Sequence, residues 1–366
     1  MNILFLSHSF WGSDFRVGSH HLSKNMARSG HRVLYVSMPV TPFHLLKYKI
    51  SDYRIKRSGI VSEIEDRLFQ YIPRLLFPVG RIFFGEKDIS LLAFNLQRIS
   101  DHLGMKQFDV VLLDEPRLYG MLGGIKFRKI VYRPTDIKTG IDFKSYFNLE
   151  DKITKAADGV IATSVPVMES LEKFFTLKSP RYVQENGVDL EHFKSNVESI
   201  KEISNLPGRK CIYVGAFDER FDFDAVKVLV KNAPDISFFF IGPGGGRIKS
   251  IDLKNCKYLG AVSFDEIPRY LRACDVAIMP FSSNPSNNGR SPMKLYEYLA
   301  AGLPVVARRT QEISRRNLER VFLYDNPEEA IKQVQAASQL KKFSQVPKEL
   351  DWSVISERMI RFCNEI

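Results

Sequence analysis

Residues 291–307, which read SPMKLYEYLAAGLPVVA, combine the signals of a helix with a charge in an unusual place. Ser291 and Pro292 favour a helix start, Gly302 favours its end, and the apolar residues that follow predict a short buried strand. Lys294 falls in the first turn, where the positive end of the helix dipole disfavours a cation by about 0.3–1 kcal/mol. A bound anion would remove that cost, so the segment predicts an anion-binding site.

Two residues near Lys294 extend this predicted site. Arg290 supplies a second cation beside the backbone amides of the helix start, and together these groups suit a diphosphate. Glu297 comes about one turn after Lys294, and its carboxylate could accept hydrogen bonds from two vicinal hydroxyl groups, such as those of a ribose. A solvated surface glutamate is the plainer interpretation of Glu297, and the sequence leaves both open.

Three further loops could line the same site, because each follows a predicted strand. Ligands of parallel α/β sheets bind beyond the carboxyl ends of the strands. Glycines in such loops let the backbone approach a ligand closely, although a flexible turn would use glycine too. The candidate positions are Gly215 and Phe217 in GAFDERF, Gly242 and Gly244 in GPGGGR, and Val262 in GAVS.

Alternating strand and helix patterns divide the chain into two similar halves. Buried strands are predicted at 2–8, 32–37, 108–114, 129–133 and 159–164, and again at 210–217, 236–242, 256–260, 276–281 and 304–307. The polar segment ENGVDLEHF interrupts the alternation, so we predict an N-terminal domain over 1–190, a C-terminal domain over 191–350 and an amphipathic helix over 351–366. Both domains should be Rossmann-like α/β domains with parallel sheets, but neither has the GxGxxG fingerprint of dinucleotide binding.

Composition narrows the class of protein. The 366 residues are 44% apolar and carry a net charge of +11, which suits two folded domains with basic surfaces. We expect no transmembrane helix and no signal peptide, and the four cysteines lack metal-ligand spacing, as is typical of a reduced cytosolic protein. The basic surplus, larger in the N-terminal half, favours phosphate, anionic lipid or nucleic acid as partner, or serves solubility alone.

Residues 42–87 interleave basic side chains with large apolar ones. Such a composition suits a peripheral enzyme that docks on an anionic membrane surface. The alternative is that the aromatic residues belong to the core and the charges are merely solvated. The candidate cations are Lys47, Lys49, Arg54, Lys56 and Arg57, and the candidate inserting residues are Phe43, Leu45 and Leu46.

The C-terminal motifs resemble those of a known family. The run YVGAF … FFFIGPG … CKYLGAVSFDEIPRYLRACDVAIMPF … SPMKLYEYLAAGLPVVA is similar to the C-terminal domain of GT-B glycosyltransferases. Within that fold, PMKLYEYLAAGLP resembles the xanthan-assembly glucuronosyltransferase and teichuronic-acid-type transferases. The resemblance covers nearly the whole chain but is specific mainly over 210–307. It implies two domains that face a central cleft, with the last helix crossing back onto the first domain.

The same resemblance assigns roles to individual residues. Met293 and Lys294 would contact the nucleotide-sugar donor near its diphosphate, and Glu297 would bind the ribose. Many retaining GT-B enzymes carry two glutamates eight positions apart, but here the first of them would fall at Gly289. The broken pair favours the inverting relatives.

An inverting transferase needs a general base for the acceptor hydroxyl. Asp136 follows the predicted strand KIVYR, in a setting similar to the catalytic aspartate of the xanthan-type enzymes, and is our first candidate; a turn or helix-cap role is the alternative. Asp14 and the Asp114–Glu115 pair are rivals, because they also follow strands. His20 could contact the acceptor, although a histidine at a helix start is more often structural.

The sequence therefore predicts a glycosyltransferase that uses a nucleotide sugar, with UDP as the expected carrier and UDP-glucuronate among the candidates. The implied acceptor is a lipid-linked saccharide of bacterial exopolysaccharide or cell-surface glycan assembly, at the inner face of the plasma membrane. We expect no metal cofactor: DFD at 222–224 opens a helix, and Lys294 and Arg290 would neutralise the leaving diphosphate. The alternatives are a sugar-nucleotide 2-epimerase of the same fold, a basic nucleic-acid-binding protein and a nicotinamide-dependent dehydrogenase.

Overall fold

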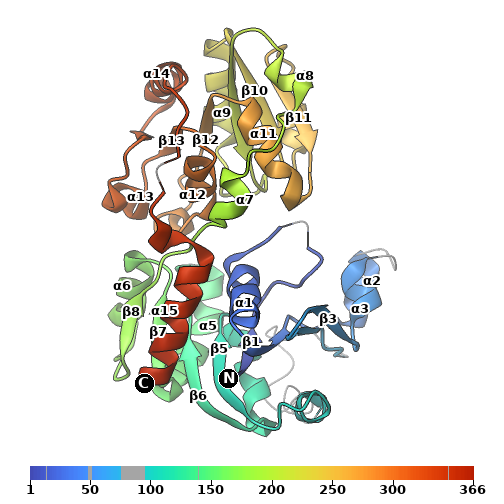
Figure 1. Ribbon diagram of the computed structural model, residues 1–366. Coiled ribbons are helices and arrows are strands. Elements are labelled where there is room, and N and C mark those ends of the chain that lie inside the picture. Colours follow the sequence, from blue (N-terminus) through green and yellow to red (C-terminus); the bar gives the residue numbers. More distant parts are fainter. Residues whose placement is uncertain (14, 48–51, 76–94, 139, 345) are drawn as a thin grey trace. The chain divides into compact units, whose positions relative to one another are not determined.

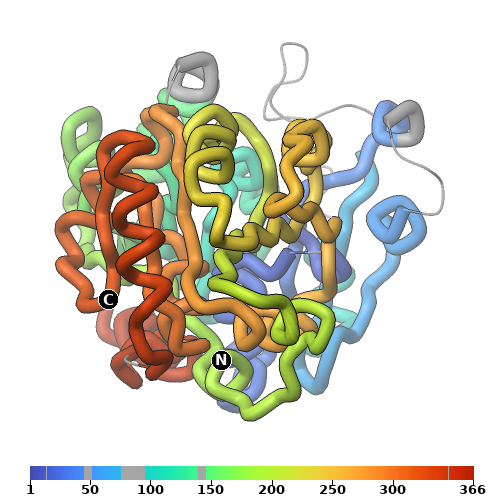
Figure 2. The backbone as a smooth tube through the Cα atoms, turned by 90° about the horizontal axis from the view of Figure 1, so that it is seen from above, coloured from blue at the N-terminus to red at the C-terminus, as the bar shows by residue number. Residues whose placement is uncertain are grey.

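The computed structural model describes residues 1–13, 15–47, 52–75, 95–138, 140–344 and 346–366, which form two compact units. Unit 1 contains Met1–Glu185 and Trp352–Ile366, and unit 2 contains Asn186–Asp351. The chain therefore leaves unit 1 at Glu185 rather than at residue 190. Both termini belong to unit 1 (Figure 1, Figure 2).

Unit 1 is built on an eight-stranded sheet in the order β3-β4-β2-β1-β5-β6-β7-β8. Its strands are β1 (Asn2–Leu6), β2 (Arg32–Val36), β3 (Val61–Glu65), β4 (Leu68–Tyr71), β5 (Phe108–Leu113), β6 (Phe127–Tyr132), β7 (Gly159–Ala162) and β8 (Arg181–Val183). Neighbouring strands run parallel, except that β3 is antiparallel to β4. The central strands read as nearly continuous apolar runs because helices cover both faces of such a sheet.

The helices of unit 1 include both the first and the last helix of the chain. They are α1 (Gly18–Arg28), α2 (Pro42–Lys47), α3 (Tyr53–Arg57), the 3₁₀ helix η1 (Pro116–Gly124), α5 (Gly140–Ala156), α6 (Val165–Phe174) and α15 (Trp352–Glu365). Helix α15 packs beside α1 (Figure 1). The rings of His21 and Trp352 stack there at 5.3 Å and 3°.

Unit 2 is built on a six-stranded, fully parallel sheet in the order β11-β10-β9-β12-β13-β14. The strands are β9 (Arg209–Val214), β10 (Ile236–Ile241), β11 (Cys256–Gly260), β12 (Val276–Met279), β13 (Val305–Arg308) and β14 (Val321–Tyr324). The helices are α7 (Leu190–Lys194), α8 (Lys201–Ser204), α9 (Phe223–Asn232), α10 (Gly246–Lys249), η2 (Phe264–Glu266), α11 (Ile267–Ala273), η3 (Pro285–Asn287), α12 (Met293–Ala300), α13 (Gln311–Arg316), α14 (Pro327–Ala337) and η4 (Lys348–Leu350).

Helix α12 forms where the sequence predicts it, but its first residue is different. Pro292, not Ser291, is the N-cap, and no side chain caps this end. The end at Gly302 is as expected: φ there is +85°, Gly302 N–H donates to Leu299 O, and Leu303 N–H donates to Tyr298 O. This pair of bonds is the Schellman arrangement that favours glycine.

The expectation that residues 42–87 form one lipid-facing surface is wrong in part. The segment contains β3 and β4, and Leu68, Tyr71 and Ile72 are buried in unit 1. Phe43 is 55% exposed, as a surface role requires, whereas Lys49 lies outside the described residues. None of the helices that the structure describes is long and apolar enough to cross a bilayer.

Candidate functional site

The loops after β9 and β10 are joined through their backbones at the carboxyl edge of the unit 2 sheet. Gly215 N–H donates to Ile241 O at 2.8 Å, and Phe217 N–H donates to Pro243 O at 3.1 Å. At Gly242, where φ is +140°, an added Cβ would lie 1.8 Å from Gly215 O. Only glycine fits this contact, so Gly242 allows the two loops to meet where ligands of parallel sheets bind.

Gly244 and Phe217 also contact each other at this junction of the two loops. Gly244 has φ of +82°, and an added Cβ would lie 3.1 Å from Phe217 O. The ring of Phe217 is buried and packs against Tyr213, Phe221 and Tyr258 at centroid distances of 5.3, 5.0 and 5.7 Å. Phe217 therefore offers its backbone to this edge, and its side chain belongs to the core.

Lys294 and Glu297 lie on the first turns of α12, and Glu297 is buried. Glu297 is 4% exposed. Among the described residues, its carboxylate makes no hydrogen bond or ion pair. Burial raises the pKa of Glu297, while the nearby charges of Lys294 and His192 oppose that rise. A buried carboxylate without donors is costly, so this position is typical of a group that a ligand completes.

His192, on α7, is a neighbour of Glu297 that the sequence analysis missed. Its Nε2 lies 3.1 Å from Phe264 O, and its ring stacks on Phe264 at 4.5 Å. The segment ENGVDLEHF showed only a domain boundary, and no spacing in it indicates that His192 faces α12.

Arg290 lies near a second charged group at the same edge. Asp218 and Arg220 form a two-residue ion pair, with Arg220 Nε 3.0 Å from Asp218 Oδ1. Burial raises the pKa of Asp218, but hydrogen bonds from Arg220 and the charge of Arg290 outweigh it, and the net pKa is lowered. Arg290 thus lies near the Asp218–Arg220 pair, and Lys294 lies near Glu297.

A buried ion pair holds the loop that precedes α12. Glu312, which is 0% exposed, binds Arg316, whose Nη2 also donates to Ser291 Oγ at 2.9 Å. Asn186 donates to Ser291 as well, from its backbone N–H to Oγ and from Nδ2 to the carbonyl oxygen, both at 2.9 Å. Ser291 therefore anchors the loop rather than capping the helix. Sequence reasoning missed this cluster.

The remaining donor-side candidates of unit 2 lie beside this edge. Met293 is the first residue of α12 and is half-buried, and Val262 is half-buried and packs against the apolar core. The acid at 222 caps α9 instead of standing open to a metal: Asp222 Oδ1 accepts from Ala225 N–H at 2.9 Å. Within the described ranges, no group of three or more His, Cys, Asp or Glu side chains is arranged to hold a metal ion.

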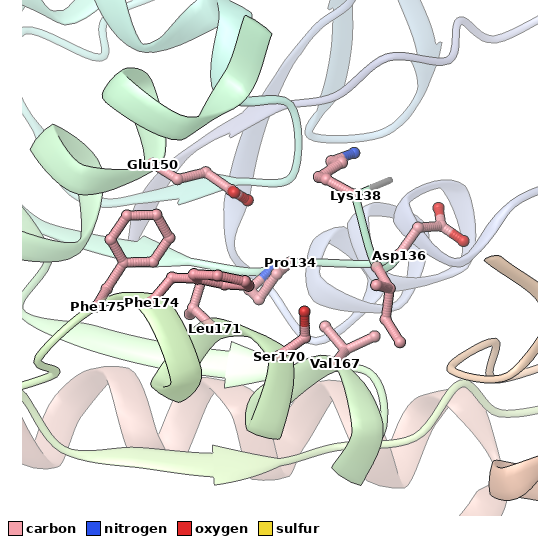
Figure 3. Close-up of a pocket in the computed structure, with 10 residues that line it drawn as sticks. Pro134, Asp136, Lys138, Glu150, Val167, Ser170, Leu171, Phe174 and Phe175 are labelled. Carbon is pink, nitrogen blue, oxygen red and sulfur yellow. The ribbon is translucent and has the colours of Figure 1, made fainter. Parts of the chain in front are cut away.

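In unit 1, Asp136 follows the carboxyl end of β6 and is half-buried. Thr135 Oγ1 donates to Asp136 Oδ2 at 3.3 Å. Asp136, Glu150 and Phe175 line a cavity of only about 20 Å³, enough for about one water molecule. Figure 3 shows the Asp136 carboxylate pointing away from Glu150 and Phe175. The cavity is therefore not a sugar pocket, and Asp136 faces outward from it.

His20 is buried in a polar network at the start of α1. Its Nε2 lies 3.2 Å from Ser9 Oγ, its Nδ1 accepts from Val17 N–H at 3.3 Å, and its ring packs on Trp11 at 4.8 Å. Burial lowers the pKa of His20 to about 3. The structure thus places His20 as a neutral side chain that orders the β1–α1 loop. Asp14 lies outside the described residues.

The Asp114–Glu115 pair follows β5 and is held by arginines. Burial raises the pKa of Glu115, but its hydrogen bonds with Arg117 outweigh this, and Arg117 Nε lies 2.8 Å from Glu115 Oε1. Arg133 Nη1 donates to Asp114 Oδ2 at 2.9 Å, and both side chains are buried. These contacts leave Asp136 the more accessible carboxylate of the three.

Comparison with known proteins gives matches to both sequence and fold. Residues 208–339 match the sequence family described as "Glycosyl transferases group 1". The chain is 30% identical over 185 residues to TuaH of Bacillus subtilis (strain 168), named there as a candidate teichuronic acid biosynthesis glycosyltransferase. This match covers 48% of the chain and 46% of TuaH, so it spans about half the length of that relative.

Solved structures share the fold of the entire chain. Sucrose-phosphate synthase from Thermosynechococcus elongatus matches with a TM-score of 0.69 and 14% identity, over 100% of this chain and 99% of that one. Anabaena Alr3699/HepE, solved in complex with UDP, matches with a TM-score of 0.64 and 16% identity, over 100% of both chains. WaaG, a glycosyltransferase involved in lipopolysaccharide biosynthesis, matches with a TM-score of 0.59 and 13% identity, over 98% and 95%. The predicted GT-B fold is therefore confirmed over the whole chain, and the match to the sequence family of glycosyl transferases group 1 covers residues 208–339.

Proposed function

We propose that the protein is a glycosyltransferase whose unit 2 binds a nucleotide-sugar donor, with UDP as the nucleotide. The observation that carries this proposal is the buried carboxylate of Glu297, which has no hydrogen-bond partner in the described chain and lies one turn from Lys294. Two ribose hydroxyls would supply the donors that Glu297 lacks, and Lys294 would meet the diphosphate. The structure of Alr3699/HepE with UDP favours UDP over other nucleotides.

The proposed reaction is a single displacement with inversion. The acceptor hydroxyl oxygen attacks the anomeric carbon, the bond from that carbon to the diphosphate oxygen breaks, and Asp136 accepts the hydroxyl proton. The electron pair of the broken bond leaves with UDP. Lys294, Arg290 and the first turn of α12 would stabilise the charge on this leaving group without a metal ion.

The acceptor in this proposal is a lipid-linked saccharide, as in the assembly of a bacterial surface glycan. The name of TuaH, a relative over about half the chain, supports this class of acceptor. Exposed residues around α2 and α3 would contact an anionic membrane at the inner face of the plasma membrane: Phe43, Lys56, Arg57 and Ile60. Arg54 would add less to that attraction, because it pairs with Asp52 at 3.0 Å.

A transfer assay tests this function. The full chain is incubated with radiolabelled UDP-glucose or UDP-glucuronate and with lipid-linked saccharides extracted from bacterial membranes. Label that moves into the lipid fraction, together with release of UDP, supports the proposal. Conversion of the donor sugar without any acceptor would instead indicate the 2-epimerase. Failure of both UDP-sugars to bind or react would refute the assignment of the donor.

A further inference from the structure

A cavity of about 270 Å³ lies between α1 and α15 of unit 1, the two helices seen side by side in Figure 1. Ser29, at the end of α1, and His31, just before β2, line one side of it. These residues mark the amino edge of the sheet, whereas Asp136 follows the carboxyl end of β6. The cavity is therefore a different site from that of the proposed base.

The wall of the cavity formed by α15 contains a buried hydroxyl group. Ser356 is 1% exposed, and its Oγ has no hydrogen-bond partner among the described residues. Met26 and Ile360 add apolar surface to the same cavity. A ligand with hydroxyl groups on a carbon framework would satisfy the serine and cover the apolar atoms at once.

Two opposite charges on α15 also line this cavity. Glu357 and Arg361 are four residues apart, the spacing at which such side chains often pair. In the part of the chain that is described, neither side chain takes part in a hydrogen bond or ion pair. The carboxylate can accept from one ligand hydroxyl, and the guanidinium can donate to the next.

His31 could donate a further hydrogen bond to the ligand, and its contact with Met1 determines which ring nitrogen carries the proton. The amino group of Met1 lies 3.2 Å from His31 Nδ1. Burial, followed by the charge of that amino group, lowers the pKa of His31, which favours the neutral ring. Because an ammonium can only donate, Nδ1 must accept, and Nε2 then carries the proton that a ligand oxygen could receive.

We propose that this cavity binds a mono- or disaccharide unit. It lies at the amino edge of the unit 1 sheet, whereas the proposed base, Asp136, lies at the carboxyl edge. The mixture of one acid, one cation, hydroxyls and a neutral histidine suits neutral sugar hydroxyls, whereas a phosphate would meet the charge of Glu357. The choice of a saccharide rests on the proposed function, since the acceptor would carry such units. The site would then hold part of the glycan away from the reaction centre.

Methyl NMR of the full chain tests this site and the donor site separately. The chain has nine methionines, so methionine methyl labelling gives few signals, and isoleucine labelling of a second sample adds Ile360. Glucose, N-acetylglucosamine and cellobiose are titrated in turn, and UDP is titrated in a separate sample. At least one sugar should shift Met26 and Ile360 with saturation, and UDP should shift Met293.

Three variants define the outcome. Glu357→Gln and Arg361→Gln should each weaken sugar binding by about tenfold or more, the scale of one charge-assisted hydrogen bond. Glu365→Gln, an exposed change on the same helix outside the cavity, should leave it unchanged. Absence of any sugar-dependent shift, or equal binding by all variants, overturns this inference. Loss of the UDP response at Met293 would instead contradict the proposed donor site.

Discussion

Gly242 contacts the backbone of Gly215 so closely that a Cβ on Gly242 would lie 1.8 Å from the Gly215 carbonyl oxygen. We predict that Gly242→Ala lowers the free energy of unfolding of unit 2 by at least about 2 kcal/mol, because it adds a clash to a positive φ. UDP affinity should fall too. Hydrogen exchange of the β9 and β10 peptides measures the local stability.

The matched control is Gly246→Ala, at the first residue of α10. An added Cβ there meets nothing within 4 Å. The stability of unit 2 should then stay within about 1 kcal/mol of the wild type or rise, because alanine favours a helix. Equal effects of the two substitutions would contradict the role given to Gly242.

Breaking the Glu312–Arg316 pair should destabilise unit 2 strongly. Both side chains are buried, so Glu312→Gln leaves the buried Arg316 cation without its acid, at a cost of roughly 3–5 kcal/mol. Arg316→Met should cost less, because Glu312 keeps its ion pair with Arg315 at 3.0 Å. Arg309→Gln, which breaks the exposed pair with Asp325, should cost less than about 1 kcal/mol. Chemical denaturation followed by circular dichroism compares the variants.

Much of the scaffold was predictable from sequence, because buried parallel strands are continuous apolar runs. Strands β9, β10 and β12 stand out in this way, and so does the glycine that ends α12. Strands β3 and β4 were missed because their short segments lie among basic residues and look like a surface. Strand β8 was missed as well, because it is only three residues long.

The site was less predictable than the scaffold, because burial is set by packing between distant segments. Glu312 and Arg316 read as an ordinary exposed helix pair, yet they are buried beneath Ser291. Glu297 could have been a solvated residue, and its burial appears only when α7 brings His192 beside α12. No spacing in the sequence indicates either contact.

Glu297 should make the stability of unit 2 depend on pH. Burial raises the pKa of Glu297 in the folded state above the ordinary value of 4.5, which holds in the unfolded state. Between 4.5 and the raised pKa, the folded state therefore keeps a proton that the unfolded state has lost. This contribution therefore falls as the pH rises through the interval, by up to about 1.4 kcal/mol per pH unit, and is constant below pH 4.5. Glu297→Gln should remove that slope.

The same substitution separates stability from binding. At neutral pH and without ligand, Glu297→Gln should be more stable than the wild type, yet it should bind UDP more weakly because the amide cannot replace the carboxylate toward both hydroxyls. Urea denaturation across a pH series gives the first result, and calorimetry gives the second. A variant that is less stable at every pH would contradict the burial argument.

Asp136→Asn should abolish sugar transfer and leave UDP binding nearly unchanged. The amide keeps the size of the carboxylate but cannot accept the hydroxyl proton, and general-base catalysis contributes about 10²–10⁴-fold to a rate. The transfer assay with radiolabelled donor measures this. Asp151→Asn, on α5, is the control, because its side chain is 40% exposed and, in the described part of the chain, pairs only with the exposed Lys155. Wild-type turnover by Asp136→Asn would place the base elsewhere.

The most direct test of the central claim is isothermal titration of UDP into the wild type, Lys294→Ala and Lys231→Ala. Lys231 is an exposed cation at the end of α9 in the same unit and controls for net charge. We predict that Lys294→Ala loses about 1.5–3 kcal/mol of binding free energy, a factor of roughly 10–150 in affinity, while Lys231→Ala binds as the wild type does. Equal UDP affinity in all three proteins, with the fold intact, would contradict the donor site proposed for unit 2.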